Sequence, residues 1–95
     1  MIDAIDEALP GADLIRTGLE DLRRGRESTE AWLVLVGAPR LRRLGIDVPH
    51  VEGGLPEHRL YERLARGDSD TAHSRYNALI RRLVSFERAA ECVRR

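Results

Sequence analysis

The stretch DTAHSRYNALIRRLVSFERAAECV, residues 70–93, decides the fold that this sequence predicts. Its apolar residues recur at steps of three and four, which is the spacing of one face of an α-helix. They are Ala72, Tyr76, Leu79, Ile80, Leu83, Phe86, Ala90 and Val93. Gly67 ends the segment that precedes this stretch, and Asp68, Ser69 and Asp70 can cap the helix, with acidic groups at its positive end. We therefore expect one long amphipathic helix here.

Two shorter segments upstream show the same helical spacing. Residues 13–24 carry a stripe that ends at Gly25, and residues 56–66 begin at Pro56, which suits the first turn of a helix. The stripe of the first segment is Leu14, Ile15, Gly18, Leu19 and Leu22, and that of the second is Leu60, Tyr61 and Leu64. Glycine within a helix costs about 1 kcal/mol relative to alanine. Gly18 therefore predicts a close crossing with another helix.

The run AWLVLV over residues 31–36 is ambiguous on its own. Continuous apolar residues with valines, followed by a glycine, are typical of a buried strand, but they also fit a helix buried on all sides. A strand needs a partner strand, and the rest of the chain has helical spacing, so we interpret this run as a buried helix. Ser28 or Thr29 can cap it. Pro39 then favours a short second helix over residues 38–44.

Two segments have weaker patterns. Residues 45–55 contain Pro49 and the pair Gly53-Gly54, which exclude a regular helix. The apolar residues expected to hold this long connection against the core are Ile46, Val48 and Val51. Residues 3–9 could form a short helix near the start of the chain. Its apolar side would consist of Ile2, Ile5 and Leu9.

Together these segments predict an all-α fold, a small compact bundle of four to five helices closed by the helix over residues 70–93. The chain has 95 residues, which is the size of one domain, so we assign residues 1–95 to a single helical domain. A chain this short has a modest core, and a long amphipathic helix on a monomer would keep part of its stripe in water. We therefore expect a homodimer or a protein partner.

The composition argues against several function classes. Acidic and basic residues number 16 each, so no net field attracts the chain to nucleic acid or to a membrane surface. No apolar run approaches the length of a membrane span, and the first residues lack the basic and apolar regions of a signal peptide. The single cysteine, Cys92, cannot form an intramolecular disulfide. We expect a cytoplasmic protein without membrane contact.

Arg66, His73 and Asn77 form the arrangement that could carry chemistry. Arginine can hold a phosphate, imidazole can transfer its protons, and the start of a helix attracts anions. The spacing of Arg66 and His73 resembles the Arg…His element of HEPN-type ribonucleases. This resemblance covers only residues 66–73 and implies an all-helical nuclease. The alternative is a capping turn followed by a histidine that makes a hydrogen bond at the helix edge.

Arg40, Arg42 and Arg43 form a basic cluster within a helix-turn-helix outline. Residues 29–37 supply the first helix, and the arginines lie on the short helix after the turn. That second helix spans only about two turns and carries no Asn, Gln or Ser for base edges. The alternative is a solvated basic face balanced by nearby acids.

We expect no metal and no cofactor. His50, His58 and His73 lack the paired spacings of metal-binding histidines. No glycine-rich loop precedes a helix with the spacing of a nucleotide-binding motif. Cys92 lies in the last turns of its helix, where the helix dipole does not favour a thiolate.

Four residues of the long helix are candidates for a protein interface, namely Tyr76, Ile80, Leu83 and Glu87. Glu87 falls within the apolar arc, so it would need an arginine from another helix or subunit if it is buried. Alternatively, the end of the helix projects beyond the core. Trp32 is the only tryptophan; we expect it in the core, and an interface anchor is the alternative.

The leading interpretation is a non-catalytic protein-interaction or accessory module that acts as a homodimer. The first alternative is an RNA-directed nuclease or a phosphate-binding helical domain that uses Arg66 and His73. The second alternative is a weak DNA-binding helix-turn-helix module that uses Arg40, Arg42 and Arg43.

Overall fold

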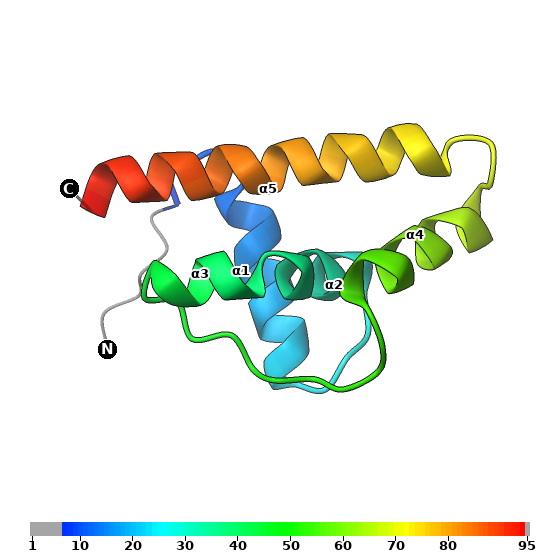
Figure 1. The fold of residues 1–95 in the computed structure, drawn as a ribbon, viewed down its shortest axis with the longest axis horizontal. Helices are drawn as coiled ribbons and strands as arrows, with labels where there is room; N and C mark the ends of the chain where they lie inside the picture. The colour runs from blue at the N-terminus through cyan, green and yellow to red at the C-terminus, as the bar shows by residue number, and fades with distance from the viewer. Residues whose placement is uncertain (1–6, 95) are drawn as a thin grey trace.

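Five helices make up most of the computed structural model, which describes residues 7–94 (Figure 1). Their order is α1 (Ala12–Arg23), α2 (Thr29–Val36), α3 (Ala38–Arg43), α4 (Pro56–Gly67) and α5 (Ala72–Arg94). These residues contain no strand, so the all-α prediction is confirmed. The ambiguous run over residues 31–36 is helical, as we inferred from the lack of a partner strand.

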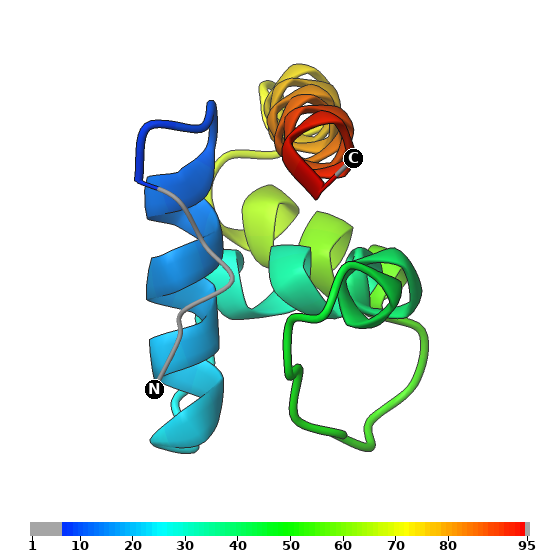
Figure 2. The ribbon, with the colours of Figure 1, turned by 90° about the vertical axis from the view of Figure 1, so that its left-hand side faces the viewer.

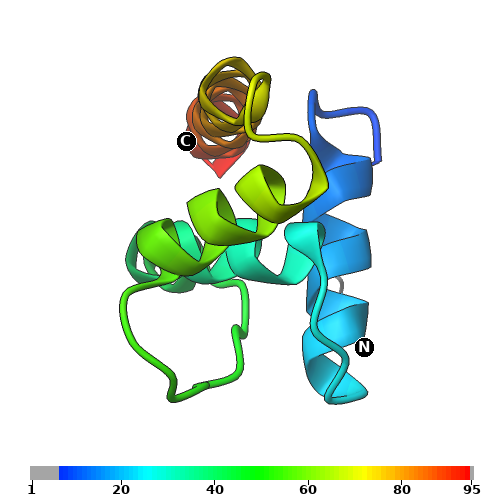
Figure 3. The same ribbon diagram turned by 90° about the vertical axis from the view of Figure 1, so that its right-hand side faces the viewer.

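α5 runs along one side of the molecule, above α4 at its beginning and above α3 toward its end (Figure 1). α1 stands beside α2, and the long connection between α3 and α4 hangs on the side opposite α5 (Figures 2 and 3). α2 therefore lies at the centre, with α1, α3, α4 and α5 packed around it.

The core forms around α2, in which residues 31–35 are all buried. This explains the continuous apolar run, because a helix surrounded by other helices has no polar face to present to water. The largest fully buried side chains come from every helix and from one loop position; they are Phe86, Ile15, Leu19, Leu33, Leu41, Leu60, Leu64, Val34 and Val48.

Gly18 makes the close helix crossing that the sequence predicts. A β-carbon at this position would collide with the Glu30 carbonyl oxygen and would lie 2.5 Å from Cγ2 of Val34. The absence of a side chain at Gly18 thus allows the backbones of α1 and α2 to touch.

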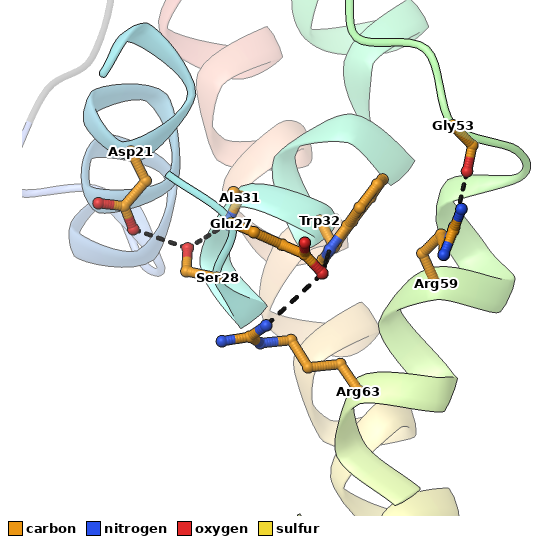
Figure 4. Close-up of polar contacts among 8 residues, drawn as sticks. All are labelled: Asp21, Glu27, Ser28, Ala31, Trp32, Gly53, Arg59 and Arg63. Carbon is orange, nitrogen blue, oxygen red and sulfur yellow. Dashed lines mark hydrogen bonds and ion pairs between the residues drawn. The ribbon is translucent and has the colours of Figure 1, made fainter. Parts of the chain in front are cut away.

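The corner between α1 and α2 is fixed by Ser28. Its Oγ accepts a hydrogen bond of 3.0 Å from the backbone N–H of Ala31, which caps α2 as predicted. The same hydroxyl donates to Oδ2 of Asp21 at 2.6 Å (Figure 4). Asp21 is buried, and its Oδ1 pairs with Nη2 of Arg26 at 2.9 Å. One carboxylate therefore joins the end of α1 to the start of α2.

Three apolar predictions are wrong: Val51 is 48% exposed, Tyr61 39% and Val93 65%. The connection beyond Val48 is held by arginine hydrogen bonds to its carbonyl oxygens, so it needs no apolar contact from Val51. Tyr61 lies at the edge of the buried face of α4, and Val93 lies beyond Ala90, the last buried residue of α5.

The helix starts differ slightly from the predictions. α5 begins at Ala72 because the backbone N–H of Arg75 donates to the carbonyl oxygen of Thr71 at 2.9 Å. Asp68 accepts the N–H of Asp70 at 3.0 Å, so this acid orders the turn and does not cap the helix. Of the short helix expected over residues 3–9, residues 3–6 lie outside the described part, and residues 7–9 form a turn and a bend.

Candidate functional site

Arg66 and His73, the predicted catalytic pair, have different surroundings. Arg66 lines a hollow that does not include His73. His73 is exposed, and its Nε2 lies 3.3 Å from Nδ2 of Asn77, which donates the hydrogen bond. The structure thus agrees with the alternative interpretation of His73, a hydrogen bond at the helix edge.

The His73 ring belongs to a group of three neighbouring rings, with Tyr61 between the other two in the chain of contacts. The Tyr61 ring lies 5.7 Å from that of Tyr76 and 6.4 Å from that of His73, measured between centroids. We call these three residues the tyrosine surface. Burial raises the pKa of the Tyr76 phenol, with a smaller contribution from the Glu57 carboxylate, so this phenol stays neutral at physiological pH.

The charged neighbours of Arg66 are two other arginines and not His73. Arg63 and Arg66 on α4 and Arg75 on α5 line one hollow of about 450 Å³, which we call the arginine hollow. Its other lining residues are Thr29, Leu64 and Gly67. The guanidinium of Arg75 passes close to the turn, because a β-carbon at Gly67 would lie 3.9 Å from Nη1 of Arg75. Of these three arginines, the sequence pattern indicates only Arg66.

Arg40 and Arg42, two of the three arginines considered for DNA binding, have partners within the chain. Nε of Arg40 donates to Oε1 of Glu91 at 2.7 Å, and its Nη1 lies 3.5 Å from Oε1 of Glu87. Arg42 donates from Nη2 to the carbonyl oxygen of Val48 at 3.0 Å. Both guanidinium groups therefore stabilise the fold. Arg43 is exposed on the same short helix, where its charge acts on Glu87.

The four interface candidates on α5 divide into two pairs. Tyr76 and Ile80 are partly exposed, whereas Leu83 and Glu87 are each 4% exposed within the single chain. Leu83 and Glu87 pack on Gly37, where a β-carbon would lie 2.8 Å from Cδ1 of Leu83 and 3.2 Å from Oε2 of Glu87. Arg40 from α3 is the arginine partner that a buried Glu87 requires. Leu83 and Glu87 are therefore core residues of the single chain and not surface contacts.

Trp32 lies in the core as expected, and it also borders a cleft of about 320 Å³ between α1, α2 and the long connection. Its Nε1 donates to Oε1 of Glu27 at 3.1 Å, and the same oxygen lies 3.7 Å from Nη1 of Arg63 (Figure 4). Arg59 lies 6.0 Å from the centre of the indole and donates from Nε to the Gly53 carbonyl oxygen at 2.6 Å. Polar groups thus hold the exposed edge of the indole and the loop in place.

Within residues 7–94 there is no cluster of three or more His, Cys, Asp or Glu side chains that could hold a metal ion. In the same part of the chain, no helix is both long and apolar enough to cross a membrane. His50 and His58 are exposed.

No protein-family model, curated protein or solved structure matches this chain. Functional assignment therefore depends on the surfaces described above.

The sequence contains a partial signal for the arginine hollow. Arg63 and Arg66 are three positions apart, which places them on adjacent parts of one helix surface. Arg75 joins them only because the turn after Gly67 reverses the chain and brings the start of α5 beside the end of α4 (Figure 3). No spacing rule predicts that contact, since it depends on how the two helices pack.

Proposed function

We propose that this chain is a non-catalytic protein-interaction module that acts as a homodimer. The observation that supports this most directly is the tyrosine surface, where Tyr61 is 39% exposed although it packs against two other rings. Tyrosine is common in the centres of protein interfaces because its ring buries a large area while its hydroxyl keeps a hydrogen-bond partner.

A second copy of the chain is the occupant that we propose for this surface. Ile80 lies one turn after Tyr76 and is also partly exposed, so it extends the apolar strip along α5. The chain has a formal net charge of +0, which means that two copies approach without net repulsion. In a two-fold arrangement the same strip serves both subunits.

The oligomeric state tests this proposal. Light scattering after size exclusion at micromolar concentration should give twice the chain mass of 10.7 kDa. Tyr61→Ala should weaken the dimer at least about tenfold, because truncated interface tyrosines often cost about 2 kcal/mol. Val51→Ala is the matched control, since Val51 is an exposed apolar residue on another part of the molecule.

A monomer for the wild type would refute the homodimer. Equal dimerisation by the wild type and Tyr61→Ala would show that another surface is used, such as the cleft beside Trp32.

We also propose the cytoplasm as the compartment, because the single cysteine, Cys92, is exposed and free, a state that the reducing cytoplasm maintains. Neither the nuclease nor the DNA-binding alternative gains a specific observation. Arg66 and His73 have separate surroundings, and Arg40 and Arg42 are engaged within the chain.

A further inference from the structure

We propose that the arginine hollow binds the phosphate monoester group of a small phosphorylated molecule. This activity goes beyond dimerisation and uses a different part of the surface. The hollow collects Arg63, Arg66 and Arg75 from two helices at one place. Guanidinium groups bind phosphate oxygens through paired, charge-assisted hydrogen bonds, and several converging on one point favour a dianion over a monoanion.

The charges of the hollow are largely uncompensated. Arg63 has a carboxylate neighbour, Oε1 of Glu27, at 3.7 Å. The guanidinium groups of Arg66 and Arg75 make no hydrogen bond or ion pair with any residue between positions 7 and 94. Arg40, by contrast, contacts two carboxylates. Bringing unpaired guanidinium groups together costs repulsion, which a bound anion would remove.

The start of α2 adds to the attraction. Thr29, the first residue of α2, lines the hollow. The first backbone N–H groups of a helix have no acceptor inside the helix, and the helix dipole places partial positive charge there. Ser28 Oγ accepts the N–H of Ala31, and the partial positive charge of the helix start lies at Thr29, on the wall of the hollow.

The volume of the hollow fits a small ligand. Its volume of about 450 Å³ falls within the range of small-molecule sites. Nucleic acid binding would require a row of cations that follows successive phosphates. Here the three arginines line a single hollow, and the exposed carboxylates of Asp68 and Asp70 on the adjoining turn oppose the extension of a polyanion beyond it.

Glycerol phosphate, with glycerol as its uncharged counterpart, provides a direct test. We expect glycerol phosphate and inorganic phosphate to shift the backbone amide resonances of Thr29 and Gly67 in a saturable NMR titration at low salt, and glycerol to shift neither. The double variant Arg66→Gln/Arg75→Gln should bind at least about tenfold more weakly, because hydrogen bonds to charged groups contribute strongly.

Arg23→Gln/Arg88→Gln is the matched control, since it removes two exposed arginines that do not line the hollow. It should keep the wild-type affinity, as should Tyr61→Ala, which separates this proposal from the homodimer. The proposal is overturned if phosphate binds nowhere or if both double variants lose affinity equally. It is also overturned if polyuridylate binds far more tightly than glycerol phosphate and depends on Arg66 and Arg75, which would indicate a nucleic-acid site.

Discussion

Glu87 is a carboxylate inside the core of a small helical protein. It is 4% exposed, and Nη1 of Arg40 lies 3.5 Å from its Oε1. Burial raises the pKa of Glu87, and this effect exceeds the opposing attraction of Arg40; Glu91 raises it further and Arg43 lowers it. Arg40 is also held by Glu91, so its positive charge is shared between two carboxylates. The ion pair therefore compensates only part of the cost of burying the Glu87 charge.

The raised pKa of Glu87 predicts a specific dependence of stability on pH. The native state holds this proton more tightly than the unfolded chain does, so the contribution of Glu87 to stability falls as pH rises through its native pKa. Glu87→Gln keeps the shape and does not titrate. Melting temperatures measured from about pH 4 to about pH 8 should therefore show the variant gaining on the wild type as pH rises.

An exposed carboxylate provides the control for this comparison. Glu62→Gln removes one negative charge at the surface and should show no such gain. If Glu87→Gln instead lost stability relative to the wild type as pH rose, the pair with Arg40 would outweigh burial, and the direction given above would be wrong.

Local chemistry decides which single residues can be predicted from the sequence. The cap by Ser28 and the close crossing at Gly18 are both visible in the sequence, because each depends on a residue type within one helical pattern. The identity of the partner of Glu87 is not visible. That partner, Arg40, lies on α3, far from Glu87 in the chain, and only the packing of α3 beneath α5 brings the two together.

On α5, the apolar stripe is wider than the part of the helix surface that packs against the other helices. Leu83 is 4% exposed, whereas Leu79, one turn earlier on the same stripe, is only partly buried. The difference arises because Gly37, at the junction of α2 and α3, lies beneath Leu83. Hydrophobic spacing predicts that both leucines face inward, but it does not say how much of the helix the neighbouring elements cover.

This difference predicts unequal costs for the same substitution. Leu83→Ala should reduce the free energy of unfolding by about 2–5 kcal/mol, because it removes a buried side chain and leaves a cavity. Leu79→Ala should cost about 1 kcal/mol, because part of its surface is already in water. Urea denaturation of both variants measures the two values. Equal losses would show that the packing under α5 is not as described.

α2 and the connection between α3 and α4 show two features that the spacing of apolar residues does not predict. α2 could be assigned only by eliminating a strand, since an apolar run without polar positions carries no period. The predicted burial of Val48 is confirmed and that of Val51 is wrong, because Arg42 and Arg59 hold the loop through its carbonyl oxygens. Hydrogen bonds from side chains to the backbone leave no pattern in the apolar residues.

In the whole molecule, α5 has two sides with different neighbours, α1 on one side and α3 on the other. Arg82 pairs with Asp13 of α1 at 3.2 Å, and Arg75, about two turns earlier, lies on the same flank. Glu87 faces Arg40 of α3, and His73, about four turns earlier, lies on that second flank. The turn after Gly67 brings Arg63 and Arg66 toward Arg75. This arrangement separates the arginine hollow from the tyrosine surface, and it separates Arg66 from His73.

The final prediction concerns RNA cleavage, which would need Arg66 on a phosphate and His73 on the proton of the same substrate. Because the two residues lie on different flanks, we expect no cleavage that depends on His73, and we expect His73→Ala to change melting only slightly, through its contacts with Asn77 and Tyr61. Incubation of a labelled RNA with the wild type and the variant, alongside their melting curves, measures both effects. Cleavage by the wild type that disappears in an equally stable His73→Ala variant would contradict this separation. It would mean that Arg66 and His73 do reach one substrate, within one chain or across two subunits.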